Sequence, residues 1–133
     1  MKIKSFQGGY DKNLSYLIWC DKTKYAAIID PAVNPMRALE YIEDSELVLS
    51  KIIITHSHYD HIKYLEDYIY KYPNIQICCH DKSDSIYHAN NVRKIENNEI
   101  IMLGEVLMIA IYTPGHYYDS ICYWLNRIFL RKE

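Results

Sequence analysis

The stretch Thr55-His56-Ser57-His58-Tyr59-Asp60-His61 holds three of the six histidines of the chain and directly follows the apolar run 52–54. In an extended backbone, side chains alternate between two faces, so His56 and His58 point the same way and can bind one ion together. Asp60 and His61 stand at the start of a helical pattern, where they can add oxygen and nitrogen ligands to that ion or to a neighbouring one. The stretch therefore predicts a metal site that the rest of the chain holds in place.

The elements on either side of this stretch form one strand–helix–strand unit. Residues 51–55 are a short apolar run, typical of a strand buried on both faces. Apolar residues then recur at helical spacing from Asp60 to Tyr72, and Pro73 ends the predicted helix. Residues 75–80 predict a second buried strand. A crossover of this kind implies that the two strands pair in parallel.

The remaining elements are placed by turn residues and by apolar alternation. A helix is expected to begin at Asn34-Pro35 and to end near Ser45. A short helix is expected over 81–88, and the polar region 90–98 carries no predicted element. The predicted strands are 2–6, 14–20 and 25–30, which form an antiparallel meander, then 99–103 and 105–112, which form a hairpin around Gly104, then 120–125 and 127–130.

His116 is a further candidate ligand. It follows Pro114-Gly115, which predicts a loop at the end of a strand. Simpler interpretations stay open: the first stretch as a polar loop that caps a helix, and His116 as an ordinary turn histidine. His80 and His88 are interpreted as structural or solvated histidines, and Asp30 as a supporting or turn residue rather than a ligand.

Length and composition bound the class of protein. The 133 residues suffice for one domain, and the formal net charge of -2 with interspersed signs gives no electrostatic footprint for nucleic acid or an anionic membrane. No apolar run is long enough to span a bilayer, and residues 1–10 lack an apolar signal core, so the cytoplasm is the predicted compartment. The four cysteines lack paired spacing, and we expect reduced thiols.

Two motifs carry a resemblance to a known family. Thr-His-Ser-His-Tyr-Asp-His at 55–61 resembles the signature of the metallo-β-lactamase superfamily, and Tyr-Thr-Pro-Gly-His at 112–116 resembles its second metal motif. Residues 13–17, 28–31 and 119–123 are similar to the glyoxalase II branch, the hydroxyacylglutathione hydrolases. The resemblance implies an α/β fold, the αββα sandwich. Residues 1–133 are then expected to form a single, truncated domain, about the N-terminal half, with a mixed β-sheet and flanking helices.

The resemblance also implies a set of ligands. The first metal site takes His56, His58 and His116, and the second takes Asp60 and His61 together with a bridging aspartate and one more histidine. The family places the bridging aspartate in a Thr-Gly-Asp segment, where this chain has Leu130-Arg131-Lys132. We therefore expect one firm site, with zinc as the metal and iron or manganese as alternatives, and a second site that is weak or empty. Asp60 is counted as a catalytic residue as well as a ligand.

The function implied by the resemblance is metal-dependent hydrolysis. A hydroxide held by His56, His58 and His116 would attack the carbonyl of a small-molecule thioester, which is derived from glutathione in the family. Two alternatives stay open: a catalytically impaired metal-binding remnant that folds as a dimer, and an iron-dependent sulfur dioxygenase of the same superfamily. Half a sandwich leaves an apolar sheet face exposed, so we expect a homodimer in which each chain covers the open face of the other.

Overall fold

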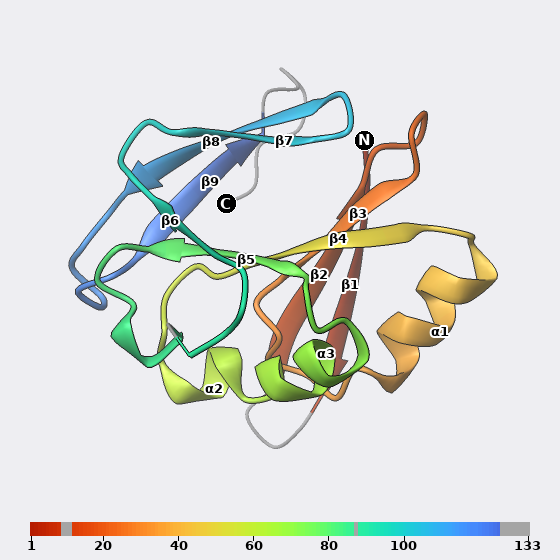
Figure 1. The fold of residues 1–133 in the computed structure, drawn as a ribbon, viewed down its shortest axis with the longest axis horizontal. Coiled ribbons are helices and arrows are strands. Elements are labelled where there is room, and N and C mark those ends of the chain that lie inside the picture. Colours follow the sequence, from red (N-terminus) through yellow and green to blue (C-terminus); the bar gives the residue numbers. More distant parts are fainter. Residues whose placement is uncertain (9–11, 87, 126–133) are drawn as a thin grey trace.

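The chain folds into three layers, with helices on one face of a large sheet and a smaller sheet on the other face (Figure 1). The computed structural model describes residues 1–8, 12–86 and 88–125. Alternation along the strands builds both interfaces: Ile28 packs in the core beneath the helices, whereas its neighbour Ile29 packs in the core between the two sheets. The α/β class and the mixed sheet predicted from the sequence are confirmed.

The large sheet has six strands in sequence order, β1 to β6. The first three pair antiparallel, as the predicted meander requires, and the last three continue in parallel. The strands are β1 Lys2–Gly8, β2 Asn13–Trp19, β3 Tyr25–Ile29, β4 Val48–Ile53, β5 Gln76–His80 and β6 Val92–Ile95. Parallel pairing of β4 and β5 confirms the predicted crossover. β6 lies in the polar region where no element was predicted.

Strand β6 escaped prediction because it is short and polar, and its Arg93 is paired with a carboxylate just beyond the strand. Arg93 donates from Nε and from a terminal nitrogen to the Glu99 carboxylate, at 3.1 and 2.9 Å. Ile95, two residues further along the strand, is fully buried between the two sheets. A single buried residue in a four-residue strand gives too little alternation to indicate a strand from sequence.

The helices are α1 Met36–Asp44, α2 Tyr59–Ile62 and α3 Leu65–Lys71. The sequence predicted one helix where α2 and α3 stand. The break has a physical reason: the Tyr64 N–H donates to the carbonyl oxygen of Pro31 at 2.9 Å, and so leaves the helical ladder. Pro73 ends the segment as expected. The short helix predicted over 81–88 is reduced to a 3₁₀ turn at Asp84–Ile86.

The second sheet is antiparallel, in the order β7-β8-β9. Its strands are β7 Ile100–Leu103, β8 Val106–Tyr112 and β9 Ile121–Leu125. The predicted hairpin around Gly104 is confirmed. Gly104 has a φ of +58°, and a Cβ there would collide with Thr23 and Cys20 in the turn between β2 and β3, so the close approach of the hairpin to this turn requires glycine. The strand predicted at 127–130 lies outside the described residues.

Hydrogen bonds join the two sheets at the carboxyl end of β4. The Ile121 N–H donates to the carbonyl oxygen of Thr55 at 2.8 Å. The Tyr123 hydroxyl crosses from the second sheet and donates to the carbonyl oxygen of Ile54 at 2.8 Å. The start of β9 is thereby fixed against the segment that leaves β4, and both segments lead to the predicted ligands.

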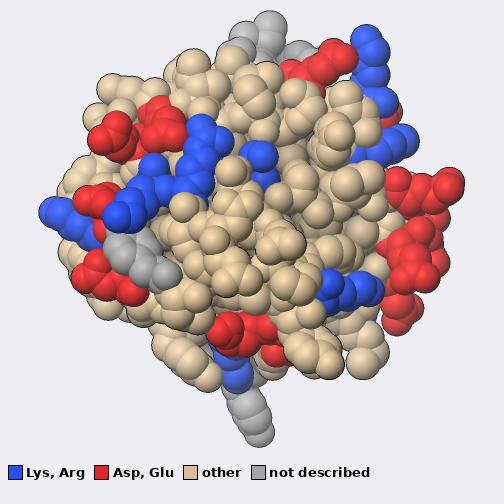
Figure 2. Space-filling model, viewed as in Figure 1, with Lys and Arg blue, Asp and Glu red and all other residues tan. Residues whose placement is uncertain are grey.

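Surface charge and helix length give two further general features. On the face shown in Figure 2, acidic and basic side chains lie beside one another around the edge of a broad uncharged area. Within the described ranges, no helix combines the length and apolar character needed to cross a membrane.

The four cysteines are unpaired. Both Cys78 and Cys79 are buried, and burial raises the pKa of the Cys78 thiol to about 11 and that of Cys79 to about 12, as for small core residues.

Candidate metal site

Three of the predicted ligands converge although they come from two distant loops. One ring nitrogen from each of His56, His58 and His116 lies within 4.8 Å of the others. The ring centroids are 4.9 to 5.0 Å apart, and the rings stand nearly perpendicular, at 79° to 89°. This arrangement suits a metal ion bound by three histidines.

The buried ring of His56 is oriented by its neighbour Thr55. The Thr55 hydroxyl donates its single proton to Asp30 Oδ2 at 2.6 Å. Its oxygen, 3.0 Å from His56 Nδ1, therefore accepts the proton carried by that nitrogen. His56 Nε2 is then the lone-pair nitrogen, and it is buried without a hydrogen-bond partner among the residues that the structure describes. An unpartnered buried nitrogen in a group of three imidazoles fits a metal ligand, because coordination removes the cost of burying it.

The carboxylate of Asp30 is the centre of this hydrogen-bond network. Besides the Thr55 hydroxyl it accepts from the Thr55 N–H at 2.8 Å and from His61 Nδ1 at 2.9 Å. Asp30 follows β3 with a φ of +58°, a conformation that aspartate tolerates better than most residues. The expected supporting role of Asp30 agrees with these contacts. One carboxylate orients His56 through Thr55, and it orients His61 directly.

The surroundings of His56 and His61 shift their pKa values in opposite directions. Burial, followed by the neighbouring imidazole of His61, lowers the pKa of His56, which favours the neutral ring that binds metals. The hydrogen bond to the Asp30 carboxylate raises the pKa of His61. The two rings lie 4.1 Å apart between centroids.

Asp60 and His61 are near the three histidines without joining their group. The group of ligand atoms within 4.8 Å comprises His56, His58 and His116. The Asp60 carboxylate accepts a long hydrogen bond, 3.5 Å, from the Asn13 side chain. A second site built on Asp60 and His61 therefore stays a prediction.

Asp119 is a site residue that the sequence did not reveal. Its carboxylate is 1% exposed and accepts from the Ser57 N–H at 3.1 and 3.2 Å and from the Ser83 hydroxyl at 2.6 Å. Ser57 lies between His56 and His58, and Asp119 closes the loop that carries His116. The carboxylate therefore joins the two ligand loops. Its partners are 62 and 36 residues away, so no local pattern indicated the role.

Aromatic side chains cover one side of the site. The ring of Tyr117 lies against His58, with centroids 3.9 Å apart. The Tyr112 hydroxyl donates to the carbonyl oxygen of Tyr118 at 2.6 Å, which fixes the loop that bears Tyr117. The other two described histidines have separate partners: His80 stacks on Tyr112, and the exposed His88 lies 2.7 Å from Glu66.

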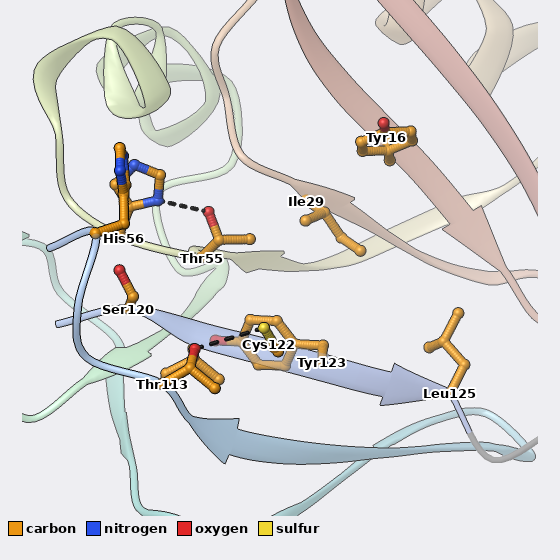
Figure 3. A pocket seen from close by; sticks show the side chains of 11 residues that line it. Tyr16, Ile29, Thr55, His56, Thr113, Ser120, Cys122, Tyr123 and Leu125 are labelled. Atoms are coloured by element: carbon orange, nitrogen blue, oxygen red, sulfur yellow. Dashed lines mark hydrogen bonds between the residues drawn. The ribbon is translucent and has the colours of Figure 1, made fainter. Parts of the chain in front are cut away.

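A cavity of about 320 Å³ opens beside His56 and His116 (Figure 3). It runs between the start of the ligand loops and the interior faces of the two sheets. Its lining comprises Tyr16, Ile29, Thr55, His56, Thr113, His116, Ser120, Ile121, Cys122, Tyr123 and Leu125.

The chain is similar to known proteins over most of its length. Residues 8–127 match the family model described as the metallo-beta-lactamase superfamily. The chain is 34% identical over 122 residues to a probable hydroxyacylglutathione hydrolase of Schizosaccharomyces pombe, and the match covers 89% of this chain and 45% of that protein. It is 32% identical over 140 residues to the cytoplasmic isozyme of hydroxyacylglutathione hydrolase from Saccharomyces cerevisiae, covering 95% and 48%.

Among solved structures, a metallo-beta-lactamase from Staphylococcus aureus has a TM-score of 0.82 and 28% identity, over 95% of this chain and 38% of that one. The chain thus spans about half the length of the curated relatives that it matches.

Proposed function

Because this chain belongs to the metallo-beta-lactamase superfamily, we propose that it is a metal-dependent hydrolase that cleaves a small thioester beside His56, His58 and His116. The observation that supports this most directly is the convergence of three imidazoles on one place, together with the buried, unpartnered Nε2 of the His56 ring. The names of the relatives support a thioester of glutathione as the substrate. Their cytoplasmic member supports the cytoplasm as the compartment.

The donor set favours zinc, with iron and manganese as alternatives. Three neutral imidazoles and an open position are the usual protein contribution to a catalytic zinc site. When bound, such an ion lowers the pKa of a water molecule from about 16 to roughly 7, and so supplies the nucleophile at neutral pH. Asp60 and His61 are proposed as ligands of a second, weaker site. Asp60 is also proposed as a catalytic residue.

The residues of the chain prepare this site in three ways. Asp30 and Thr55 hold His56 in the tautomer whose Nε2 is free for a ligand. Asp119 holds the loops of the two motifs together. Tyr117 covers His58 and limits the approach of water from that side. Each contribution is made before substrate binds, which is the preorganisation that catalysis of this kind requires.

Hydrolysis of a hydroxyacylglutathione thioester, followed by loss of thioester absorbance, tests the proposal. We expect zinc-dependent turnover by the unaltered chain and a rate at the uncatalysed background for His58→Ala. His88→Ala is the matched control, because this exposed histidine pairs with Glu66 rather than with the triad. Equal rates for the unaltered chain and His58→Ala would reject the enzyme and leave a metal-binding remnant as the better account.

A further inference from the structure

The cavity beside the histidines differs in polarity from one end to the other. Thr55, His56, Thr113 and Ser120 lie at one end in Figure 3, and Tyr16, Ile29 and Leu125 lie at the other. Ile29 and Leu125 belong to the core between the two sheets. The cavity is therefore a slot that leads from the candidate metal site into apolar surroundings.

Ser120 supplies an uncommitted donor at the polar end. It is 9% exposed, and its hydroxyl has no hydrogen-bond partner within the described part of the chain. Its backbone groups are already engaged, since the N–H donates to Tyr117 and the carbonyl oxygen accepts from Thr113. In Figure 3 the side-chain oxygen points toward His56. A buried hydroxyl without a partner costs free energy, and a ligand carbonyl at this place would remove that cost.

The size of the slot fits a small organic group. Its volume of about 320 Å³ lies at the lower end of the range, roughly 300–1,000 Å³, of pockets that bind small molecules. Such pockets combine apolar walls with a few polar groups that fix orientation. A group with a carbonyl at one end and an apolar chain at the other matches this slot in both respects.

We propose that the slot binds the acyl chain of the substrate, with the thioester carbonyl accepting a hydrogen bond from Ser120 Oγ and an unbranched apolar chain of several carbons beside Ile29 and Leu125. This inference rests on the proposed function and deepens it, because it assigns the substrate class as apolar acyl thioesters. Hydrolysis breaks the C–S bond and forms a C–O bond to the oxygen of one water molecule. The products are a carboxylate and a thiol, and one proton goes to solvent.

Binding of the product acids tests the slot without requiring turnover. Straight-chain carboxylates of two, four, six and eight carbons are titrated into the zinc-loaded full chain by calorimetry. We expect affinity to rise about fourfold for each buried methylene until the slot is filled. Equal affinity for all four acids would overturn the slot. If the chain-length dependence is present and no thioester is hydrolysed, the slot stands and the proposed function falls.

Two variants separate the ends of the slot. Ser120→Ala should weaken binding of every acid by about the same factor, roughly 2- to 13-fold for one lost hydrogen bond. Ile29→Ala should change the dependence on chain length, because it enlarges the apolar end. Ile28→Ala is the matched control: the same atoms are removed from the neighbouring residue, which packs under the helices instead. An unchanged affinity in Ser120→Ala, or the same length profile in both isoleucine variants, would contradict the proposal.

Discussion

Asp30 determines which ring nitrogen two histidines present to a ligand. Its carboxylate accepts the hydrogen bond of the Thr55 hydroxyl, so the Thr55 oxygen can only accept from His56 Nδ1. The same carboxylate also accepts from His61 Nδ1. Nε2 of each ring is thereby left for other partners. Oxygen acceptors behind metal-binding histidines are a common way of fixing the tautomer and orientation of the ring.

Replacing Asp30 with asparagine tests this role. Asparagine also tolerates the positive φ, so the substitution removes the charge and leaves the backbone unstrained. In the metal-free protein the pKa of His61 should fall, since the Asp30 hydrogen bond is the largest cause that raises it. Titration of the His61 ring by NMR measures the change. An unaltered midpoint in Asp30→Asn would show that the carboxylate does not control this imidazole.

The same shift predicts a pH dependence of stability. A raised pKa in the folded state means that the Asp30–His61 pair stabilises the fold fully below pH about 6.5, the ordinary value for histidine. This contribution is lost as the pH rises through the raised pKa. Asp30→Asn should therefore destabilise the metal-free protein more at pH 5.5 than at pH 8, as measured by urea unfolding.

Sequence and structure differ in what each reveals about single residues. The ligands His56 and His58 are recognisable because a strand places them two residues apart on one face. His116 is recognisable through the second motif. The roles of Asp119 and Ser120 are not recognisable from sequence, because they depend on tertiary contacts. The Asp119 carboxylate accepts a hydrogen bond from Ser57, and the Ser120 hydroxyl has no partner among the described residues.

Among the elements, two ligand loops are joined at one point. The Asp119 carboxylate accepts from the Ser57 N–H, which lies between His56 and His58. The N–H of Ile121, two residues after Asp119, donates to the carbonyl oxygen of Thr55. These bonds link the end of β4 to the start of β9. The spacing of the three histidines therefore depends on contacts between elements rather than within either motif.

Asp119→Asn should weaken zinc binding by about tenfold or more, in the range seen when residues behind metal ligands are changed. The amide presents N–H donors or a weaker acceptor to Ser57 and Ser83, which loosens the joined loops. Competition with a chromogenic chelator measures the affinity. Glu99→Gln is the matched control, because that carboxylate also accepts three hydrogen bonds but from Arg93 and Glu96.

A loss of zinc affinity in Asp119→Asn that is equalled in Glu99→Gln would indicate general destabilisation rather than positioning of the ligand loops.

The order and type of most elements follow from patterns within the sequence. The parallel pair β4 and β5 and the hairpin of β7 and β8 were predicted because their apolar residues and turns are local signals. The break between α2 and α3 was missed because it depends on a hydrogen bond from Tyr64 to Pro31, distant in the chain. Tertiary contacts here override a regular helical pattern.

For the molecule as a whole, the outer face of the second sheet is apolar. Ile100, Met102, Ile111 and Trp124 are 49%, 46%, 36% and 47% exposed. These side chains alternate along β7, β8 and β9 with residues that are buried against the large sheet. Soluble monomers seldom leave a contiguous apolar face of this kind uncovered. We propose that a second copy of the chain covers it.

Sedimentation velocity at micromolar concentration should then show a dimer. Met102→Lys and Trp124→Lys should each shift the chain toward monomer, because a charge on the apolar face would be buried in the interface. Tyr70→Lys is the control, since this side chain is 90% exposed on α3, on the other side of the large sheet. A soluble monomer for the unaltered chain would reject the dimer.

For the whole molecule, we propose that His56, His58 and His116 bind one metal ion together. Elemental analysis of the purified, zinc-loaded chain after gel filtration tests it most directly. We expect about one zinc per chain for the unaltered protein and for His88→Ala, and almost none for His56→Ala, His58→Ala or His116→Ala, with folding verified by circular dichroism. Zinc retained at the same level in a folded variant that lacks one of the three histidines would contradict it.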